Sequence, residues 1–190
     1  MGMPAILSHY WTAEEVLAIP DSPPYRFEAV DGELFVSPAP PIAHQLAIGE
    51  LFVRLKAYVE RCRIGKAVTS PFDVVADKLT VVHPDVFVLP LVDGRPARSW
   101  REAGRLLLAI EVLSPSSDRA DRFAKRAKYS QMGTEYWLVD LEARVIERWM
   151  PGTEEPQVVT EVLRWTAPGA EEAVEISVQE VVARAWGELL

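Results

Sequence analysis

The feature that most constrains this fold is an apolar run near the middle of the chain, residues 106–110, which ends at Glu111. A continuous apolar run of this length is typical of a strand that is buried on both faces of a sheet. We therefore expect a central strand over residues 106–113, with Glu111 inside it. A carboxylate in such a position is normally paired with a base or bound to a metal ion. Taken alone, Glu111 fits these two interpretations equally well.

Helices and strands alternate along the rest of the chain. Capping motifs and apolar residues at helical spacing predict helices at residues 13–18, 42–61, 118–132 and 178–186. Short segments rich in Val, Leu and Ile predict further strands at residues 67–76, 80–82, 86–89, 135–140, 145–150 and 157–165. Asp31-Gly32, between residues 25–30 and 33–37, is a strong hairpin signal. This order predicts an α/β fold, in which helices pack against a mixed sheet, within a single domain over residues 1–190.

The composition is that of a soluble globular protein, with 49% hydrophobic and 25% charged residues. No segment approaches the roughly 18 apolar residues of a membrane span, and residues 1–10 lack the pattern of a secretion signal. The single cysteine, Cys62, cannot form an internal disulfide. We therefore expect a cytoplasmic protein without a membrane partner.

The net charge of -8 limits how the chain could bind nucleic acid. Proteins that hold nucleic acid tightly and without sequence preference are usually basic, because neutralising phosphates drives that binding. An acidic chain is expected to bind nucleic acid weakly and with strong salt dependence, or to require a metal ion.

A second acidic residue, Asp85, follows Pro84 at the start of the apolar segment 86–89. For a lone aspartate, a turn residue at a strand end is the simpler interpretation. Two carboxylates on neighbouring strands can, however, jointly bind a hard cation such as Mg2+, which takes oxygen ligands. Such an ion lowers the pKa of a bound water and neutralises charge on a phosphoryl oxygen. Asp85 and Glu111 together therefore indicate a candidate metal site.

The predicted helix after Glu111 is basic although the chain is acidic. Its Lys and Arg residues are Arg119, Arg122, Lys125, Arg126 and Lys128. A helix N-terminus adds partial positive charge, so this element favours phosphate. For most of these residues a solvated helix face is the simpler interpretation, with Asp121 and Lys125 as an i,i+4 pair worth roughly 0.3–0.5 kcal/mol. Lys125 is an exception to this interpretation, because its amine could orient a metal-bound water or stabilise the transition state.

Glu28 is a third acidic candidate. Alternation along residues 25–29 places Arg26 and Glu28 on the same face of the predicted strand. Glu28 could hold a metal-bound water, but pairing with Arg26 or another surface base is the favoured interpretation. His44, near the start of the long helix, could donate to a phosphate, whereas Tyr136 and Trp137 are expected in the core or at an interface.

These motifs together resemble the Uma-type restriction endonuclease family, which belongs to the PD-(D/E)XK nuclease superfamily. The resemblance rests on Pro84-Asp85, Ile-Glu-Val-Leu-Ser-Pro-Ser-Ser at residues 110–117, Asp121-x-x-x-Lys125, and Glu-Tyr-Trp-Leu-Val-Asp at residues 135–140. It extends from about Thr12 through the last predicted helix. It implies a restriction-endonuclease-like core, with the N-terminal hairpin as an addition and an Mg2+ site at the edge of the sheet; Mn2+ is a possible substitute.

The resemblance also implies roles for individual residues. By position, Asp85 and Glu111 look like the metal ligands, with the Val112 carbonyl as a third, and Glu28 looks like the acidic residue of the N-terminal region. The superfamily lysine is expected two residues after the glutamate, where this chain has Leu113. Lys125 resembles a lysine that has migrated to the following helix.

The implied function is Mg2+-dependent hydrolysis of phosphodiester bonds, in DNA rather than RNA, with Glu28, Asp85, Glu111 and Lys125 as catalytic residues. A homodimer is expected at the level of the family, since two cuts in a duplex suit a two-fold assembly. The net charge and Leu113 motivate an alternative. In that case the chain keeps the nuclease fold without significant activity and binds nucleic acid or assembles with proteins.

Overall fold

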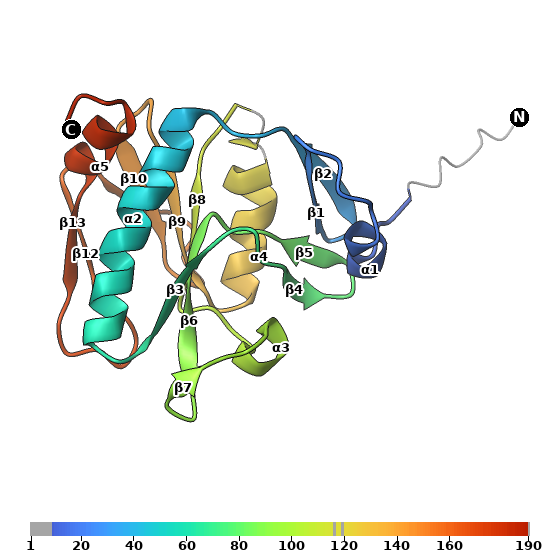
Figure 1. Ribbon diagram of the computed structural model, residues 1–190, viewed down its shortest axis with the longest axis horizontal. Coiled ribbons are helices and arrows are strands. Elements are labelled where there is room, and N and C mark those ends of the chain that lie inside the picture. The colour runs from blue at the N-terminus through green and yellow to red at the C-terminus, as the bar shows by residue number, and fades with distance from the viewer. Residues whose placement is uncertain (1–8, 116, 119, 190) are drawn as a thin grey trace, which may run out of the picture.

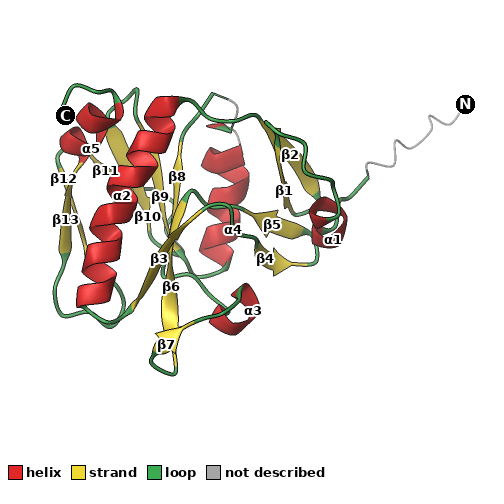
Figure 2. Cartoon of the chain, viewed as in Figure 1, coloured by secondary structure: helices red, strands yellow, loops and turns green. Residues whose placement is uncertain are grey.

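The computed structural model describes residues 9–115, 117–118 and 120–189. Figures 1 and 2 show the helices, which are α1 (Ala13–Leu17), α2 (Ile42–Arg61), α3 (Trp100–Ala103), the π-helix η1 (Ala120–Lys125), α4 (Arg126–Gln131) and α5 (Val178–Ala185). The strands are β1 (Arg26–Val30), β2 (Glu33–Ser37), β3 (Gly65–Thr69), β4 (Val74–Asp77), β5 (Thr80–Val82), β6 (Val86–Val92), β7 (Arg95–Pro96), β8 (Leu108–Val112), β9 (Glu135–Asp140), β10 (Val145–Trp149), β11 (Gln157–Val159), β12 (Val162–Trp165) and β13 (Val174–Ser177).

The strands form a mixed seven-stranded sheet and two smaller sheets. The large sheet has the order β11-β10-β9-β8-β6-β3, with β7 joined to β6. Strands β8 and β9 run parallel, whereas the other pairs in this sheet are antiparallel. A four-stranded sheet has the order β2-β1-β5-β4, and β12 pairs with β13. The predicted α/β fold with a mixed sheet is therefore confirmed.

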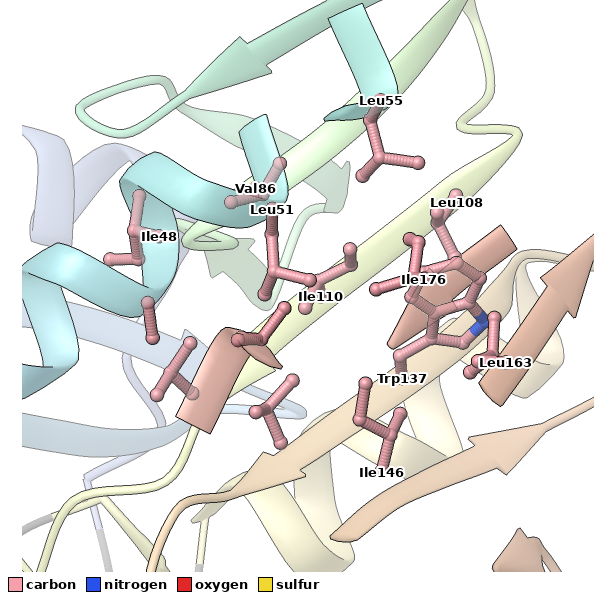
Figure 3. Close-up of a cluster of buried hydrophobic side chains, with 14 of the residues drawn as sticks. Ile48, Leu51, Leu55, Val86, Leu108, Ile110, Trp137, Ile146, Leu163 and Ile176 are labelled. Atoms are coloured by element: carbon pink, nitrogen blue, oxygen red, sulfur yellow. The ribbon is translucent and has the colours of Figure 1, made fainter. Parts of the chain in front are cut away.

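One face of the large sheet packs against α2 and α5 (Figure 3). Apolar residues of α2 at helical spacing, Ile48, Leu51 and Leu55, contact the central strands there. Trp137 on β9 and Trp165 on β12 are fully buried in the same cluster, and their rings meet edge to face. The expectation that Trp137 belongs to the core is confirmed.

The opposite face packs against η1, α4 and the four-stranded sheet. Alternation along β6 sends Val86 and Val88 into the α2 cluster, and Phe87 into this second cluster. Tyr136 also lies here, stacked on Tyr129 of α4, so its predicted core position is confirmed. Odd-numbered residues of β6 therefore point toward the helix that carries Lys125.

Two predicted strands are each divided in the structure. Residues 67–76 form β3 in the large sheet and β4 in the small one, because Pro71 between them has no N–H to continue a ladder. Residues 157–165 form β11, which pairs with β10, and β12, which pairs with β13. The prediction of one continuous strand in each place is wrong. Both halves of each segment have a composition that favours strands, but the two halves pair with different strands.

The helix predicted over residues 118–132 is confirmed over residues 120–131, but its first half, η1, is π-helical and only α4 is α-helical. The predicted hairpin is confirmed. Asp31 and Gly32 both have positive φ, 49° and 85°, as a two-residue hairpin turn requires. Among the described residues, no helix combines the length and apolar character needed to cross a membrane.

Candidate active site

The large sheet brings Asp85 and Glu111 opposite each other. Strands β6 and β8 are antiparallel neighbours, with Val86 paired with Ile110. Continuing this register by one residue places Asp85 directly across from Glu111. Side chains opposite each other on neighbouring strands have Cβ atoms about 4.5–5.5 Å apart and share one face of the sheet. Both carboxylates are buried, on the face covered by η1 and α4.

Asp85 is held by groups from three elements. The backbone N–H of Val112 donates to Asp85 Oδ2 over 2.9 Å, and His44 Nε2 of α2 lies 3.1 Å from the same oxygen. Arg26 of β1 approaches Asp85 Oδ1 at 3.7 Å. The carboxylate at the mouth of β6 is therefore fixed in place, and its two oxygens face different partners.

Lys125 of η1 lies at the centre of the acidic residues. Its Nζ is 2.7 Å from Glu28 Oε2, 3.0 Å from Asp121 Oδ1 and 3.1 Å from Glu111 Oε1. These side chains are almost fully buried. The predicted i,i+4 pair of Asp121 and Lys125 is present, but it lies in the interior rather than on a solvated face. The exception that we made for Lys125 is supported by its position.

Glu28 and Glu111 each have one further donor. The backbone N–H of His83 donates to Glu28 Oε1 over 2.7 Å, and the Tyr129 hydroxyl donates to Glu111 Oε1 over 3.3 Å. Glu28 therefore pairs with Lys125, not with Arg26, which contacts Asp85 instead. The favoured interpretation, that Glu28 pairs with Arg26 or another surface base, is wrong, because its partner Lys125 is buried. The two residues do share a strand, but the tertiary fold decides which partner each one meets.

The cluster contains more carboxyl groups than basic groups. Burial raises the pKa of Glu111 well above its ordinary value, and the neighbouring carboxylates add to this rise against the effect of Lys125. Burial also raises the pKa of Asp121. Burial alone would lower the pKa of Lys125, but Asp121, Glu111 and Glu28 outweigh it and raise this pKa well above its usual range. Lys125 is thus held in its charged form, and the excess of carboxylates favours a further cation.

A cavity of about 30 Å³ opens onto this cluster. Glu28, Asp85, Glu111 and Lys125 all line it, so the structure brings these four predicted residues to one place. A site needs about 10–15 Å³ to accommodate one water molecule. This cavity therefore has room for about two water-sized groups.

The other basic residues of this helix that the structure describes, Arg122, Arg126 and Lys128, are engaged with neighbouring side chains. Arg122 is bound by Asp118, Asp140 and Glu147, at 2.7–2.8 Å. Lys128 is buried against Asp31 and Asp77, so its interpretation as part of a solvated face is wrong. Arg126 lies over the Trp149 ring, at 4.5 Å from its centroid. Arg119 is outside the described residues.

Two residues at the site have contacts that the sequence did not predict. Asp121 was interpreted only as a partner of Lys125 on the helix surface, and His44 as a possible phosphate donor. The structure places Asp121 in the interior beside Lys125 and Glu111, and His44 against Asp85. A signal for Asp121 existed in its i,i+4 spacing from Lys125. His44 had none, because only the packing of α2 brings it to β6.

The donor chemistry of the site fits a hard divalent cation. Asp85 and Glu111 offer carboxylate oxygens on neighbouring strands, which is the ligand type that Mg2+ takes. In the described part of the chain, no three His, Cys, Asp or Glu side chains form a ready metal site. Mg2+ is usually held by one or two carboxylates and keeps several waters, so two carboxylates are sufficient.

The two residues that follow Glu111 are held by hydrogen bonds from their backbone N–H groups. Val112 donates its N–H to Asp85, and its side chain is buried in the α2 cluster. It is not one of the described residues that line the cavity, and the role of its carbonyl stays a prediction. Leu113 donates its N–H to the Val139 carbonyl and packs against the second cluster, so Lys125 is the amine beside Glu111.

Comparison with known proteins gives a family and a fold. A family profile described as "Uma2: Putative restriction endonuclease" matches residues 13–179. A crystal structure described as "a putative nuclease belonging to DUF820", from Anabaena variabilis, is similar with a TM-score of 0.73 and 20% identity, over 92% of this chain and 99% of that one. At this identity the likeness shows the fold alone, which confirms the predicted restriction-endonuclease-like architecture. Curated proteins gave no match. The profile covers most of the chain, and the protein therefore belongs to the Uma2 restriction endonuclease family.

Proposed function

We propose that this protein is an endonuclease that hydrolyses phosphodiester bonds of DNA with the help of Mg2+. The observation that carries the proposal is the cross-strand pair of Asp85 and Glu111, which shares one cavity with the buried Lys125. Membership of a nuclease family supports the same reaction class. A structural ion-pair network would not need an excess of carboxylates around one lysine or an opening to the surface.

Asp85 and Glu111 would hold the ion, with the Val112 carbonyl as the third protein ligand; Mn2+ would substitute for Mg2+. When bound, the ion lowers the pKa of a water and neutralises charge on a phosphoryl oxygen. The N–H of Val112 and His44 Nε2 orient the Asp85 carboxylate, because both contact its Oδ2 atom. These contacts fix one ligand before the ion arrives.

Lys125 would act on the attacking water and on the charge that develops at the phosphate. Its ammonium group can donate to a water beside Glu111 and can stabilise negative charge in the transition state. Glu28 and Asp121 hold the amine in position through ion pairs of 2.7 and 3.0 Å. In this proposal Lys125 supplies the function of the superfamily lysine that Leu113 cannot provide.

The charge of the chain bears on how DNA would bind. The net charge of -8 and the pairing of Arg122 and Lys128 with acids leave few free bases for phosphates near the site. Binding should therefore be weak, sensitive to salt and dependent on the metal ion. We propose a homodimer as the working assembly, because a two-fold pair of sites can cut both strands of a duplex. Light scattering on the purified protein tests that part.

The proposal is tested by incubating purified protein with plasmid DNA, and separately with single-stranded DNA, in Mg2+ or Mn2+, beside Asp85→Ala and Glu111→Ala. We expect metal-dependent cleavage by the wild type and none by either variant. Absence of cleavage with every divalent ion, or equal cleavage by the variants, contradicts it. Calorimetry provides a separate test, because Mg2+ should bind the wild type and not Glu111→Gln. No Mg2+ binding by the wild type would favour a nuclease fold that serves only in binding or assembly.

A further inference from the structure

Two larger cavities adjoin the small cavity at Glu111. One, of about 280 Å³, shares Arg26 and His83 with it; the other, of about 380 Å³, shares His44 and Ser114. The two large cavities have no lining residue in common, so they flank the small one on different sides. Residues of α1 and β1 line the first cavity, whereas residues at the N-terminal end of α2 and Trp186, directly after α5, line the second. Figure 1 shows α1 and α5 on opposite sides of α2. The first volume is just below the lower limit of small-ligand sites, about 300 Å³, and the second is just above it.

The first cavity has an exposed aromatic side chain in its wall. Tyr25, immediately before β1, is 53% exposed, and Leu17 at the end of α1 is half exposed beside it. His83 Nε2 and Asp73 Oδ1 lie 2.9 Å apart in the same wall, at hydrogen-bond distance. The cavity thus combines an exposed aromatic ring with polar groups, and it shares Arg26 with the small cavity at Glu111.

The second cavity has the same character. Trp186, directly after α5, lines it and is 45% exposed. Its Nε1 donates to the Leu141 carbonyl over 3.4 Å, which restrains the orientation of the indole. Three acidic residues, Asp118, Asp140 and Glu142, also line this cavity. Asp118 and Asp140 are paired with Arg122, so Glu142 is the carboxylate of this wall that can accept a hydrogen bond from the amino group of a base.

We propose that these two cavities receive nucleobases on either side of the scissile phosphate, so that the site acts on a DNA strand whose bases are unpaired there. This inference rests on the proposed nuclease function and specifies its substrate. Bases in a duplex are stacked and paired with each other, and they would have to leave the helix to enter either cavity. Exposed aromatic rings bind unpaired bases of any sequence by stacking. An acidic protein can use such contacts where phosphate contacts are scarce.

The test is a binding measurement that does not depend on cleavage. Fluorescence anisotropy is measured with a labelled single-stranded oligonucleotide and with its duplex, in Ca2+, a hard cation that takes the same oxygen ligands as Mg2+. Tyr25→Ala and Trp186→Ala are compared with Tyr25→Phe and Trp186→Phe, which keep a ring. Phe123→Ala is the control, because Phe123 is 65% exposed and lines none of the three cavities.

We expect the single strand to bind at least about tenfold more tightly than the duplex. Each alanine variant should lose about tenfold in affinity for the single strand, whereas the phenylalanine variants and Phe123→Ala should stay within about twofold. An oligonucleotide built of abasic sites throughout should bind the wild type more weakly than the normal single strand does, whereas Tyr25→Ala and Trp186→Ala should distinguish the two less.

Two outcomes separate this inference from the proposed function. If plasmid cleavage depends on Asp85 and Glu111, but duplex and single strand bind equally and neither alanine variant matters, the inference is wrong and the nuclease function stands. If the wild type neither binds nor cleaves DNA of any form, both are wrong.

Discussion

Lys125 and Lys128 are one helical turn apart, and both are buried and paired with acids, yet they lie in different surroundings. The partners of Lys125 are Glu28, Glu111 and Asp121, all of them buried beside a cavity. Lys128 pairs with Asp31 and Asp77, whose side chains are 65% and 46% exposed. One lysine belongs to a cluster that excludes most water, and the other connects the helix to the hairpin at the protein surface.

The comparison shows what burial of the partners changes. Exposed carboxylates remain hydrated whether or not the lysine is present, so the Lys128 contacts add little beyond holding the hairpin. Buried carboxylates depend on Lys125, because removing one partner of a buried pair leaves a charge without compensation. A buried lysine can therefore connect two parts of the fold, as Lys128 does, or take part in the proposed reaction, as Lys125 would.

The largest expected difference is in activity. Lys125→Met should lower the rate of DNA cleavage by at least about 100-fold, which is the usual contribution of a positioned acid or base. Lys128→Met should stay within about threefold, because Lys128 does not line the cavity at Glu111. Rates are measured with plasmid under single-turnover conditions, after circular dichroism has verified folding. Equal losses in the two variants would remove the distinction between the two lysines, and Lys125→Arg tests whether charge alone suffices.

Stability should differ in the same direction. Lys125→Met should lower the free energy of unfolding by about 3–5 kcal/mol at neutral pH, because Glu28, Asp121 and Glu111 would remain buried together. Urea unfolding without divalent ions measures this. The double variant Lys125→Met with Glu111→Gln should recover part of the loss, since it removes one uncompensated charge. A loss under 1 kcal/mol in Lys125→Met would show that the cluster tolerates its own charge.

Metal binding provides the third contrast. At about 100 times its dissociation constant, Mg2+ should raise the stability of the wild type by about 2.7 kcal/mol, since it binds only the folded state. Lys128→Met should respond equally, whereas Glu111→Gln and Asp85→Asn should not respond. Thermal unfolding with and without Mg2+ tests this. A shift that persists in both ligand variants would place the ion somewhere else.

Much of this arrangement could be predicted from the sequence, because it depends on residues that are neighbours in the chain or that recur at a regular spacing. Apolar runs located the strands that carry Asp85 and Glu111, and their antiparallel register then decided that the two carboxylates meet. The capping box at Thr12 and the Asp31-Gly32 turn were also readable from a few residues. Such features depend on neighbours in sequence, and they were predicted correctly.

Other parts of the site depend on contacts between distant segments. Glu28 meets Lys125 because the four-stranded sheet packs against η1, and His44 meets Asp85 because the N-terminal end of α2 lies beside the start of β6. No pattern in residues 25–29 or 42–61 specifies these partners. The π-helical geometry of η1 was likewise hidden, since its composition is that of an α-helix.

The smallest expected effect concerns Lys128 and its dependence on pH. Burial lowers the pKa of Lys128, but its bonds to Asp31 and Asp77 outweigh this effect and raise it above 10.5. Burial raises the pKa of Asp77, but Lys128 and the Leu79 N–H outweigh it and bring the value below 3.8. The stabilisation from Asp77 is therefore present above pH 3.8 and is lost as the pH falls through the lowered value. The stabilisation from Lys128 is present below pH 10.5 and is lost as the pH rises through the raised value.

Lys128→Met should cost about 0.5–1 kcal/mol at pH 7, discounted because both partners are exposed, and nothing at a pH well below the lowered value of Asp77. Urea unfolding of the wild type and Lys128→Met across this range tests the claim, and a difference that does not change with pH would show that lost packing, not charge, accounts for it.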